Sequence, residues 1–407
     1  MLQNTTLFLT KILKGIGLCL LFSCYGVSGQ KSFKTGEIID AVPVVNTTNE
    51  SFALYLPSSY SSDTPNPIIF LFEPGGRGRT GIVPFLEASE KYGLILVCSN
   101  SSKNGSFQES FSIAQNLFNH IFNTFSVDVS QMYLGGFSGG SRLATAIASL
   151  SGQFTGVVAC GAGFSPNPAH RPSLSPFLYV GICGVKDMNY KELLENQKYL
   201  SRLKFKNTLI SFDGGHQWPD KKEINRAIDW LFISSQKQLL NESLEKNIKN
   251  AFIKEYELTQ DFLNEGELLF ALENYQRILQ LFPQQITLDS VRLQYNELTS
   301  TKRYKTALKN REEAFKKEEL LRKKLLGKIH NDLNSLGKTN FNWWKKELEK
   351  LDKMEAKGNK ALKHMLARVR YSIIAAIYER RFSQPGVVYN DQYKTFVQNF
   401  REMLHFN

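Results

Sequence analysis

Cysteine and histidine are scarce in this sequence, with five Cys and six His among 407 residues. Two cysteines fall in the N-terminal segment, and the other three, Cys98, Cys160 and Cys183, fall in predicted strands. An odd number of cysteines on buried strands argues against a disulfide framework and for small apolar core residues. No Cys or His spacing is typical of zinc, so no metal site is expected.

Long apolar runs are scarce too. Near the N-terminus, Ile16–Phe22 follows two lysines and precedes the small residues Val27–Gly29. This run is too short to span a bilayer, and residues 1–29 are predicted to be a signal peptide. We therefore expect an exported protein (periplasmic, cell-surface or secreted) with no transmembrane helix in the mature chain. Leu21–Ser23 and Cys24 also resemble a bacterial lipoprotein signal, which leaves lipidation of Cys24 as an alternative.

The most informative stretch is Gly136–Gly140, Gly-Phe-Ser-Gly-Gly, which fits the pattern G-x-S-x-G. A strand pattern precedes it and a helical pattern follows it, so Ser138 is predicted at the apex of a tight strand-to-helix turn. Glycines suit such a turn because its flanks must be small. A serine held there points out of the sheet and can attack a carbonyl carbon if a base and an acid reach it.

Candidate partners for Ser138 follow downstream. Asp187 lies just past the apolar run 177–182. His216 follows the apolar run 209–212 and two glycines. The order Ser138, Asp187, His216 is the nucleophile–acid–base order of α/β-hydrolases. All three fall at carboxyl ends of predicted parallel strands, where open α/β sheets place their sites. In this chemistry the histidine accepts the serine proton and the aspartate orients the imidazole.

Each of these assignments has an alternative. Asp187 could simply cap the helix that begins near Asn189. His216 could be an ordinary loop histidine, and Asp213 is a rival acid because it lies closer to His216 in the sequence. The joint order and spacing of the three residues favour the catalytic interpretation.

Strand and helix patterns alternate through residues 33–237, which predicts an α/β domain with a doubly wound, mostly parallel sheet. The later strands are continuous apolar runs, typical of a sheet that is covered on both faces. The expected strands are 52–57, 68–72, 94–98, 132–135, 156–161, 177–182 and 209–212. The expected helices are 82–92, 108–125, 139–150, 191–203 and 221–234.

This region resembles compact α/β-hydrolases of the polyhydroxybutyrate-depolymerase, feruloyl-esterase and dienelactone-hydrolase type. The resemblance rests on Gly136–Gly140, on Gly-Val-Lys-Asp at 184–187, on Gly-Gly-His at 214–216 and on the amphipathic helix at 221–234. It implies a serine esterase that cleaves carboxylic esters or related acyl bonds through an acyl-enzyme, without a metal or another cofactor. The substrate would be a small ester or a polymer-linked acyl group.

Such an enzyme also needs hydrogen-bond donors for the oxyanion of the tetrahedral intermediate. One donor is expected to be the backbone N–H of Gly139, and the other should come from the loop at 73–78. Relatives usually carry His-Gly or His-Gly-Gly there, whereas this chain has Pro-Gly-Gly at 74–76. The histidine is missing while the glycines remain, so Gly76 is the first candidate for the second donor and Gly75 the alternative.

Residues 240–407 are poor in Pro and Gly and show no strand pattern, which predicts an all-α, helical-repeat-like second domain. One segment resembles a tetratricopeptide repeat, through the spacing of Leu258, Phe262, Gly266, Ala271, Tyr275, Ile278 and Pro283. A weaker match pairs 371–382 with 396–403. A single repeat cannot bury its own faces, so this domain must pack on neighbouring helices or on the hydrolase domain.

Positive charge is concentrated in residues 301–370, where the excess of Lys and Arg equals the net charge of +12 for the whole chain. This region could meet a protein or an anionic glycan partner, although solvated helix faces explain the charge equally simply. No nucleic-acid-binding motif is present, so nucleic acid is not an expected partner. The sequence thus predicts an exported serine hydrolase. The alternative is an envelope scaffold protein whose helical domain binds a partner beside an inactive hydrolase-like domain.

Overall fold

The computed structural model describes residues 33–173, 175–235, 242–282, 287–383 and 391–405. The predicted signal peptide, with Cys24, and Pro283 of the repeat pattern lie outside these residues. The chain divides into two compact units that are not consecutive in sequence. The first contains the described residues up to Ile182, Glu192–Ile210 and 218–235; the second contains Cys183–Lys191, Ser211–Gln217 and the described residues from 242 onwards.

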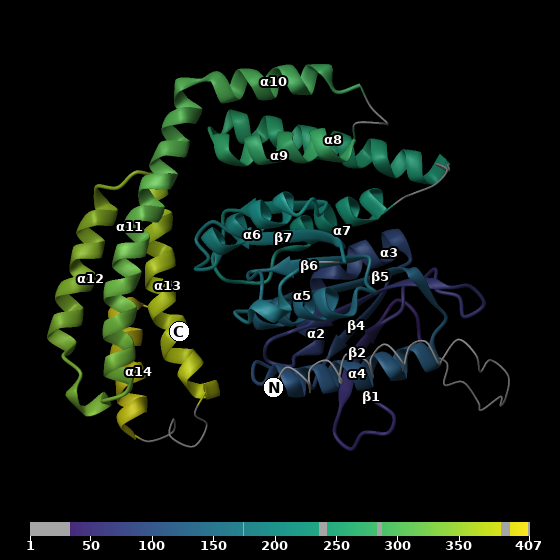
Figure 1. The fold of residues 1–407 in the computed structure, drawn as a ribbon, viewed down its shortest axis with the longest axis horizontal. Coiled ribbons are helices and arrows are strands. Elements are labelled where there is room, and N and C mark those ends of the chain that lie inside the picture. Colours follow the sequence, from purple (N-terminus) through teal and green to yellow (C-terminus); the bar gives the residue numbers. More distant parts are fainter. Residues whose placement is uncertain (1–32, 174, 236–241, 283–286, 384–390, 406–407) are drawn as a thin grey trace. The chain divides into compact units, whose positions relative to one another are not determined.

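Eight strands form one sheet, in the order β1-β2-β4-β3-β5-β6-β7-β8 (Figure 1). Strand β2 is antiparallel to both of its neighbours, and the run from β4 to β7 is parallel. This strand order is that of the α/β-hydrolase fold. The strands are β1 (Ile38–Pro43), β2 (Ser51–Tyr55), β3 (Asn66–Phe72), β4 (Ile95–Ser99), β5 (Val127–Phe137), β6 (Gly156–Cys160), β7 (Leu178–Gly184) and β8 (Asn207–Phe212).

The continuous apolar runs are buried strands, as their pattern predicts. Residues 68–72 of β3 have no exposed surface. The three cysteines of the described chain are buried and form no disulfide, and they lie in β4, β6 and β7. Strand β1 has no counterpart among the expected strands, because it lies at the edge of the sheet and only Val42 of its six residues is buried.

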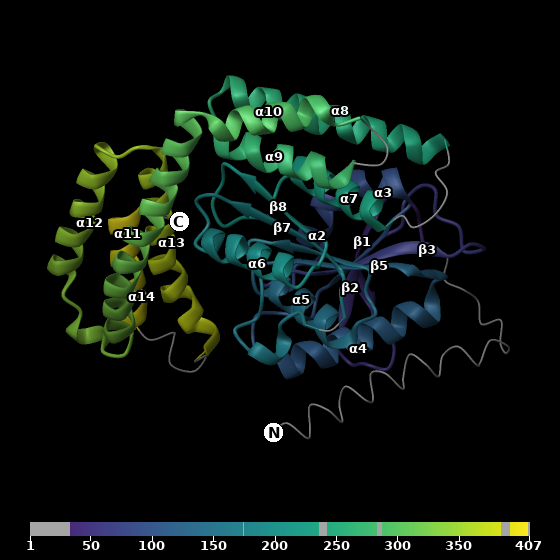
Figure 2. The same ribbon diagram turned by 45° about the horizontal axis from the view of Figure 1, so that its top comes forward.

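Helices cover both faces of this sheet. Residues of α4 (Phe107–Thr124), α5 (Gly139–Ser151) and α6 (Tyr190–Arg202) join one apolar core with the strands. Helices α3 (Leu86–Tyr92) and α7 (Lys221–Ser235) pack together (Figure 2), and Trp230 of α7 is fully buried. Both views show α4 on one side of the strands and α3 with α7 on the other.

The single helix expected at 82–92 is broken. The chain forms α2 (Gly78–Ile82), then a 3-10 turn at Val83–Phe85, and then α3. The physical reason is Pro84, which has no N–H to donate and whose ring clashes with the preceding turn of an α-helix.

The helices of the second unit stand side by side in two groups (Figure 1). Helices α8 (Glu242–Asn264), α9 (Leu268–Leu281) and α10 (Asp289–Ser300) form the first group. Helices α11 (Lys302–Leu333), α12 (Phe341–Ala356), α13 (Lys360–Ser383) and α14 (Asp391–Leu404) form the second. Helices α8 and α9 make an antiparallel hairpin that turns at Gly266, whose φ of 76° suits glycine. A helix pair thus exists where the tetratricopeptide spacing was noted, while the repeat itself stays a prediction.

The second group has its own apolar core. Trp344 is fully buried there and donates its indole N–H to Asp332 over 2.7 Å. Of the helices that the structure describes, none is both long and apolar enough to cross a bilayer.

Candidate active site

Ser138 sits in a strained turn between the end of β5 and the first residue of α5. Its φ of 53° and ψ of −120° are rare for any residue other than glycine. A hydrogen bond of 2.8 Å from its N–H to the carbonyl of Cys160 helps to hold this conformation. A Cβ at Gly140 would overlap the Phe72 carbonyl, and one at Gly136 would approach the Gly140 carbonyl carbon to 2.5 Å. The two flanking glycines are therefore required by the close approach of the backbone.

The loop after β3 satisfies its own backbone groups through Glu73, a buried residue that the sequence interpretation did not single out. The Gly76 N–H donates to the Glu73 carbonyl over 3.0 Å, and the Gly75 N–H donates to the Glu73 carboxylate over 2.7 Å. Both candidates for the second oxyanion donor are thus bonded within the loop. The N–H of Gly139 is different, because it opens α5 and has no intrahelical acceptor. The Asn104 side chain lies against Gly139, where a Cβ would overlap it.

The structure brings Asp187 and His216 together. His216 Nδ1 lies 2.8 Å from Asp187 Oδ2, and the two side chains are 8% and 1% exposed. The other carboxylate oxygen accepts the Asn189 N–H over 2.8 Å. A carboxylate oxygen accepts, so the tautomer that fits this contact donates from Nδ1 and has its lone pair on Nε2. Both residues belong to the second unit, whereas Ser138 belongs to the first.

The rival acid, Asp213, has other partners. Its carboxylate lies 2.8 Å from Lys186 Nζ and 3.8 Å from His364 Nε2, and its side chain is half exposed. Burial acts to raise the pKa of Asp213, but the hydrogen bond and the charge of Lys186 outweigh it, so the pKa is lowered. Asp213 is therefore part of a partly exposed ion-pair cluster, and it is Asp187 that bonds to the imidazole.

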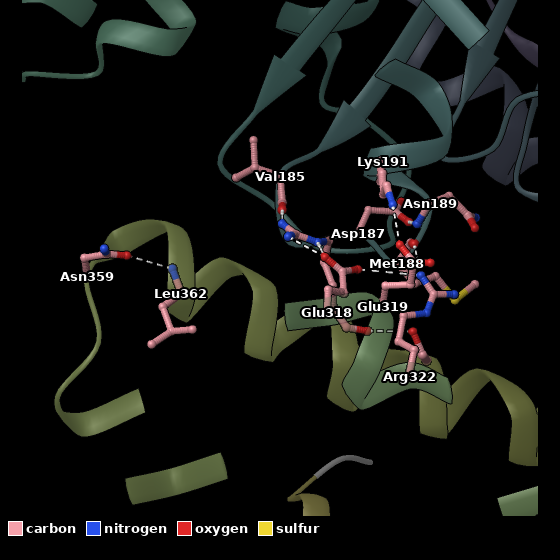
Figure 3. Close-up of polar contacts among 12 residues, drawn as sticks. Val185, Asp187, Met188, Asn189, Lys191, Glu318, Glu319, Arg322, Asn359 and Leu362 are labelled. Carbon is pink, nitrogen blue, oxygen red and sulfur yellow. Dashed lines mark hydrogen bonds and ion pairs between the residues drawn. The ribbon is translucent and has the colours of Figure 1, made fainter. Parts of the chain in front are cut away.

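The loop that carries Asp187 is held by α11 and α13. Arg368 of α13 donates to the Val185 carbonyl over 2.7 Å. It also makes two hydrogen bonds, of 2.8 and 2.6 Å, to one carboxylate oxygen of Glu318. The Arg368 and Glu318 side chains are 3% and 2% exposed. On the other side of Asp187, Arg322 donates to the Met188 carbonyl over 2.9 Å (Figure 3). Carbonyls on both sides of the acid are thus tied to the helices.

The loop that carries His216 is held in the same way. The Glu273 carboxylate of α9 accepts the Ser211 N–H over 2.7 Å and its hydroxyl over 2.6 Å. The Tyr371 ring of α13 lies 5.4 Å from the His216 ring, inclined at 50°. Burial, followed by the charge of Asp187, raises the pKa of Tyr371, which keeps its phenol neutral. Residues from three helices therefore shape the surroundings of the acid–base pair.

None of these helical residues was identified from the sequence. One signal was present: Arg368 lies among Met365, Leu366 and Val369, all of which are buried. An arginine on the apolar face of a helix indicates a buried ion pair. Its partner, Glu318, lies 50 positions away, and no local pattern links the two.

His364, near the start of α13, gives the second unit a dependence on pH. Burial lowers the pKa of His364 to about 4 from 6.5; Asp213 opposes this, while Lys360, Lys186 and Arg368 add to it. Between these two values the unfolded chain binds a proton that the folded chain does not, so stability falls as the pH is lowered through this window.

We expect the free energy of unfolding of the wild type to fall between pH 7 and pH 5 by about 2 kcal/mol more than that of His364→Asn. Urea unfolding at both pH values measures this difference, with His330→Asn on exposed α11 as the control. Equal losses in all three chains would contradict it.

Three arginines of the segment after β3 and of α5 have acidic partners: Arg77 with Glu73, Arg79 with Asp40 and Arg142 with Glu192. Within the described ranges, no three His, Cys, Asp or Glu side chains are grouped so that they could hold a metal ion.

No family model matches the chain, and no curated protein matches it in sequence. Solved structures resemble about half of it. Fluorophosphonate-binding serine hydrolase F of Staphylococcus aureus is 14% identical with a TM-score of 0.41, covering 49% of this chain and 99% of its own. S-formylglutathione hydrolase of the same organism is 17% identical with a TM-score of 0.40, covering 49% and 98%. Esterase 2 of Thermogutta terrifontis is 14% identical with a TM-score of 0.40, covering 53% and 100%. The fold assignment itself rests on the strand order and on the turn at Ser138.

Proposed function

We propose that this protein is a serine hydrolase that cleaves carboxylic esters, with Ser138 as nucleophile, His216 as base and Asp187 as the residue that orients the base. The observation that carries the proposal is the backbone of Ser138. Strained conformations of residues other than glycine persist where function needs them, and a serine at a strand-to-helix apex presents its hydroxyl to a substrate. The buried hydrogen bond between His216 and Asp187 supports the same function.

In the proposed reaction, Ser138 Oγ attacks the acyl carbon and its proton passes to His216 Nε2. Asp187 stays ionised and stabilises the imidazolium. The tetrahedral intermediate then collapses: the bond to the alcohol oxygen breaks, the alcohol leaves with the proton from His216, and an ester to Ser138 remains. Water repeats the sequence and releases the carboxylic acid. The atoms balance without a metal or another cofactor.

The oxyanion would accept from the N–H of Gly139, which lies at the start of α5. Gly76 is the proposed second donor, and it can act only if its hydrogen bond to the Glu73 carbonyl opens. Losing one such donor costs about 10²–10³-fold in kcat in well-studied acyl-transfer enzymes. An oxyanion site with a single donor would thus still be active, but slow.

The experiment that tests the proposal is covalent labelling. A fluorophosphonate probe should react with the wild-type protein, and peptide mapping should place the adduct on Ser138. The labelled protein should no longer hydrolyse a nitrophenyl acetate. An unlabelled protein without turnover would favour the second candidate, an envelope scaffold with an inactive hydrolase-like domain. The occupied N–H groups of Gly75 and Gly76 are the observation that keeps this candidate in play.

A pair of acid variants separates the two aspartates. We expect Asp187→Asn to lower kcat for the acetate ester by about 10⁴-fold, because an amide at that position favours the wrong tautomer of His216. Asp213→Asn should change kcat less than tenfold, since its partners are Lys186 and His364. Steady-state kinetics at pH 8 measure both. A larger loss for Asp213→Asn would reverse the assignment of the acid.

Two further proposals rest on the sequence. Residues 1–29 would direct export as a signal peptide, and the alternative is a lipoprotein signal in which Cys24 is lipidated. The basic helices between 301 and 370 would meet a protein or a glycan partner.

A further inference from the structure

The second unit contains a cavity beside the loop that carries Asp187. Its volume is about 280 Å³, the space of about nine water molecules. Val185 and Tyr190 form its wall on the side of this loop, and the remaining wall comes from the start of α9, the N-terminal half of α11 and the start of α13. Most of the wall is apolar, including Leu269, Phe270 and Ala314.

The charged groups around the cavity are paired, with one exception. Lys360 pairs with Glu267, and Arg368 pairs with Glu318. Arg311 is the exception among the described lining residues, because its ion pair with the exposed Glu312 is long, at 3.7 Å. Its side chain is 24% exposed, but its Nε atom is buried and has no hydrogen-bond partner. A buried donor without an acceptor costs about 1–3 kcal/mol, a cost that a bound acceptor would remove.

The backbone adds to the positive potential at this cavity. Helices α9 and α13 both begin at its wall, at Leu268 and Lys360. The N-cap residue of α9, Glu267, makes no side-chain cap hydrogen bond. The first N–H groups of a helix lack intrahelical acceptors, and the helix dipole is positive at this end. Asn359 already caps α13, because its side-chain oxygen accepts the Leu362 N–H over 3.0 Å. The uncapped start of α9 and the Arg311 Nε atom are therefore what favour an anion at one side of a mostly apolar space.

We propose that this cavity binds a small amphipathic carboxylate, such as a straight-chain acid of six to eight carbons. The carboxylate accepts from Arg311 Nε, and the hydrocarbon part packs against Leu269, Phe270 and Ala314. An inorganic anion would leave the apolar wall in contact with water, and a neutral hydrocarbon would leave Arg311 Nε without an acceptor. A ligand that suits this wall therefore needs both a carboxylate and a hydrocarbon chain. The proposal is independent of hydrolysis at Ser138.

Calorimetric titration of the full chain with octanoate tests this site. The Ser138→Ala chain should bind octanoate as the wild type does, which separates this site from the proposed esterase chemistry. Arg311→Gln should weaken octanoate at least tenfold and leave 1-octanol unchanged, because only the charged ligand uses the guanidinium. Ala314→Leu, which fills the space, should weaken both ligands.

Lys309→Gln is the matched control, since it removes the same charge from a side chain on α11 that is 75% exposed. It should bind both ligands as the wild type does, and thermal melts of all variants establish that they are folded. Two results would overturn the proposal: no octanoate binding to the wild type, or octanoate binding that Arg311→Gln and Ala314→Leu leave unchanged. In either case, labelling at Ser138 still reports separately on the proposed hydrolase.

Discussion

Replacing Ser138 with alanine should lower kcat for a short acyl ester by about 10⁶-fold, the scale found when a serine hydrolase of another fold loses its nucleophile. The fold should survive, because alanine keeps the Cβ and alters no backbone contact of the turn. Kinetics with nitrophenyl acetate and a thermal melt measure the two effects. Ser149→Ala, in the same helix, removes a hydroxyl that donates only to the Thr145 carbonyl and should leave kcat unchanged.

The glycine variant sharpens this test. Ser138→Gly should be equally inactive, yet more stable than Ser138→Ala by about 1 kcal/mol, because glycine tolerates a φ of 53°. If the strain at Ser138 is kept for function, relieving it should abolish activity and increase stability. If Ser138→Ala retained full turnover, the proposed nucleophile would be excluded.

The second large effect is expected from the helices. A chain that ends after Ser235 should have no measurable turnover, although it keeps every strand and all three proposed catalytic residues. The loops 183–191 and 211–217 would lose the hydrogen bonds that hold Val185, Met188 and Ser211. A displacement of about 1 Å in a catalytic group can cost 10²-fold in rate. Full turnover by the shortened chain would show that these loops support themselves.

A double variant tests the same point without removing a domain. Arg368→Met combined with Glu318→Leu removes both charges of the buried ion pair, because a single charge left buried alone would cost about 3–5 kcal/mol. Arg322 also loses its 3.6 Å contact with Glu318, but its side chain is 32% exposed. We expect kcat to fall 10- to 100-fold with little change in KM, because the acid moves while substrate contacts stay. Arg370→Met is the matched control, since Arg370 pairs with Asp352 and Glu355 at the surface of the same helix. An equal loss in the control would indicate general destabilisation.

Local patterns predicted most of the sheet and the turn at Ser138. Buried strands such as 68–72 are continuous apolar runs, and the glycines around Ser138 are dictated by overlaps with nearby backbone. Strand β1 lacks such a run, and Pro84 divides a helix whose apolar spacing looks unbroken. Both errors have local causes, and Pro84 is a residue from which the break in the helix could have been predicted.

The contacts of the loops that carry Asp187 and His216 could not be predicted, for a different reason. Sequence order places Asp187 and His216 with the strands that precede them. Their hydrogen bonds to residues of α9, α11 and α13 depend on contacts across many positions, such as the 183 that separate Val185 from Arg368. Similarly, Gly75 and Gly76 are readable as donors, but their bonds to Glu73 depend on the conformation of the loop. Sequence patterns therefore predict the residues of the candidate site, but not the hydrogen bonds that hold them in place.

The order in which these parts are synthesised has a consequence for the living cell. The turn at Ser138 leaves the ribosome early, whereas α13 is among the last segments to be made. At about 5–20 residues per second, many seconds pass before Arg368 can reach Val185. A growing or prematurely terminated chain would therefore carry Ser138 without a fixed base, and the proposed hydrolase would stay inactive until translation is nearly finished.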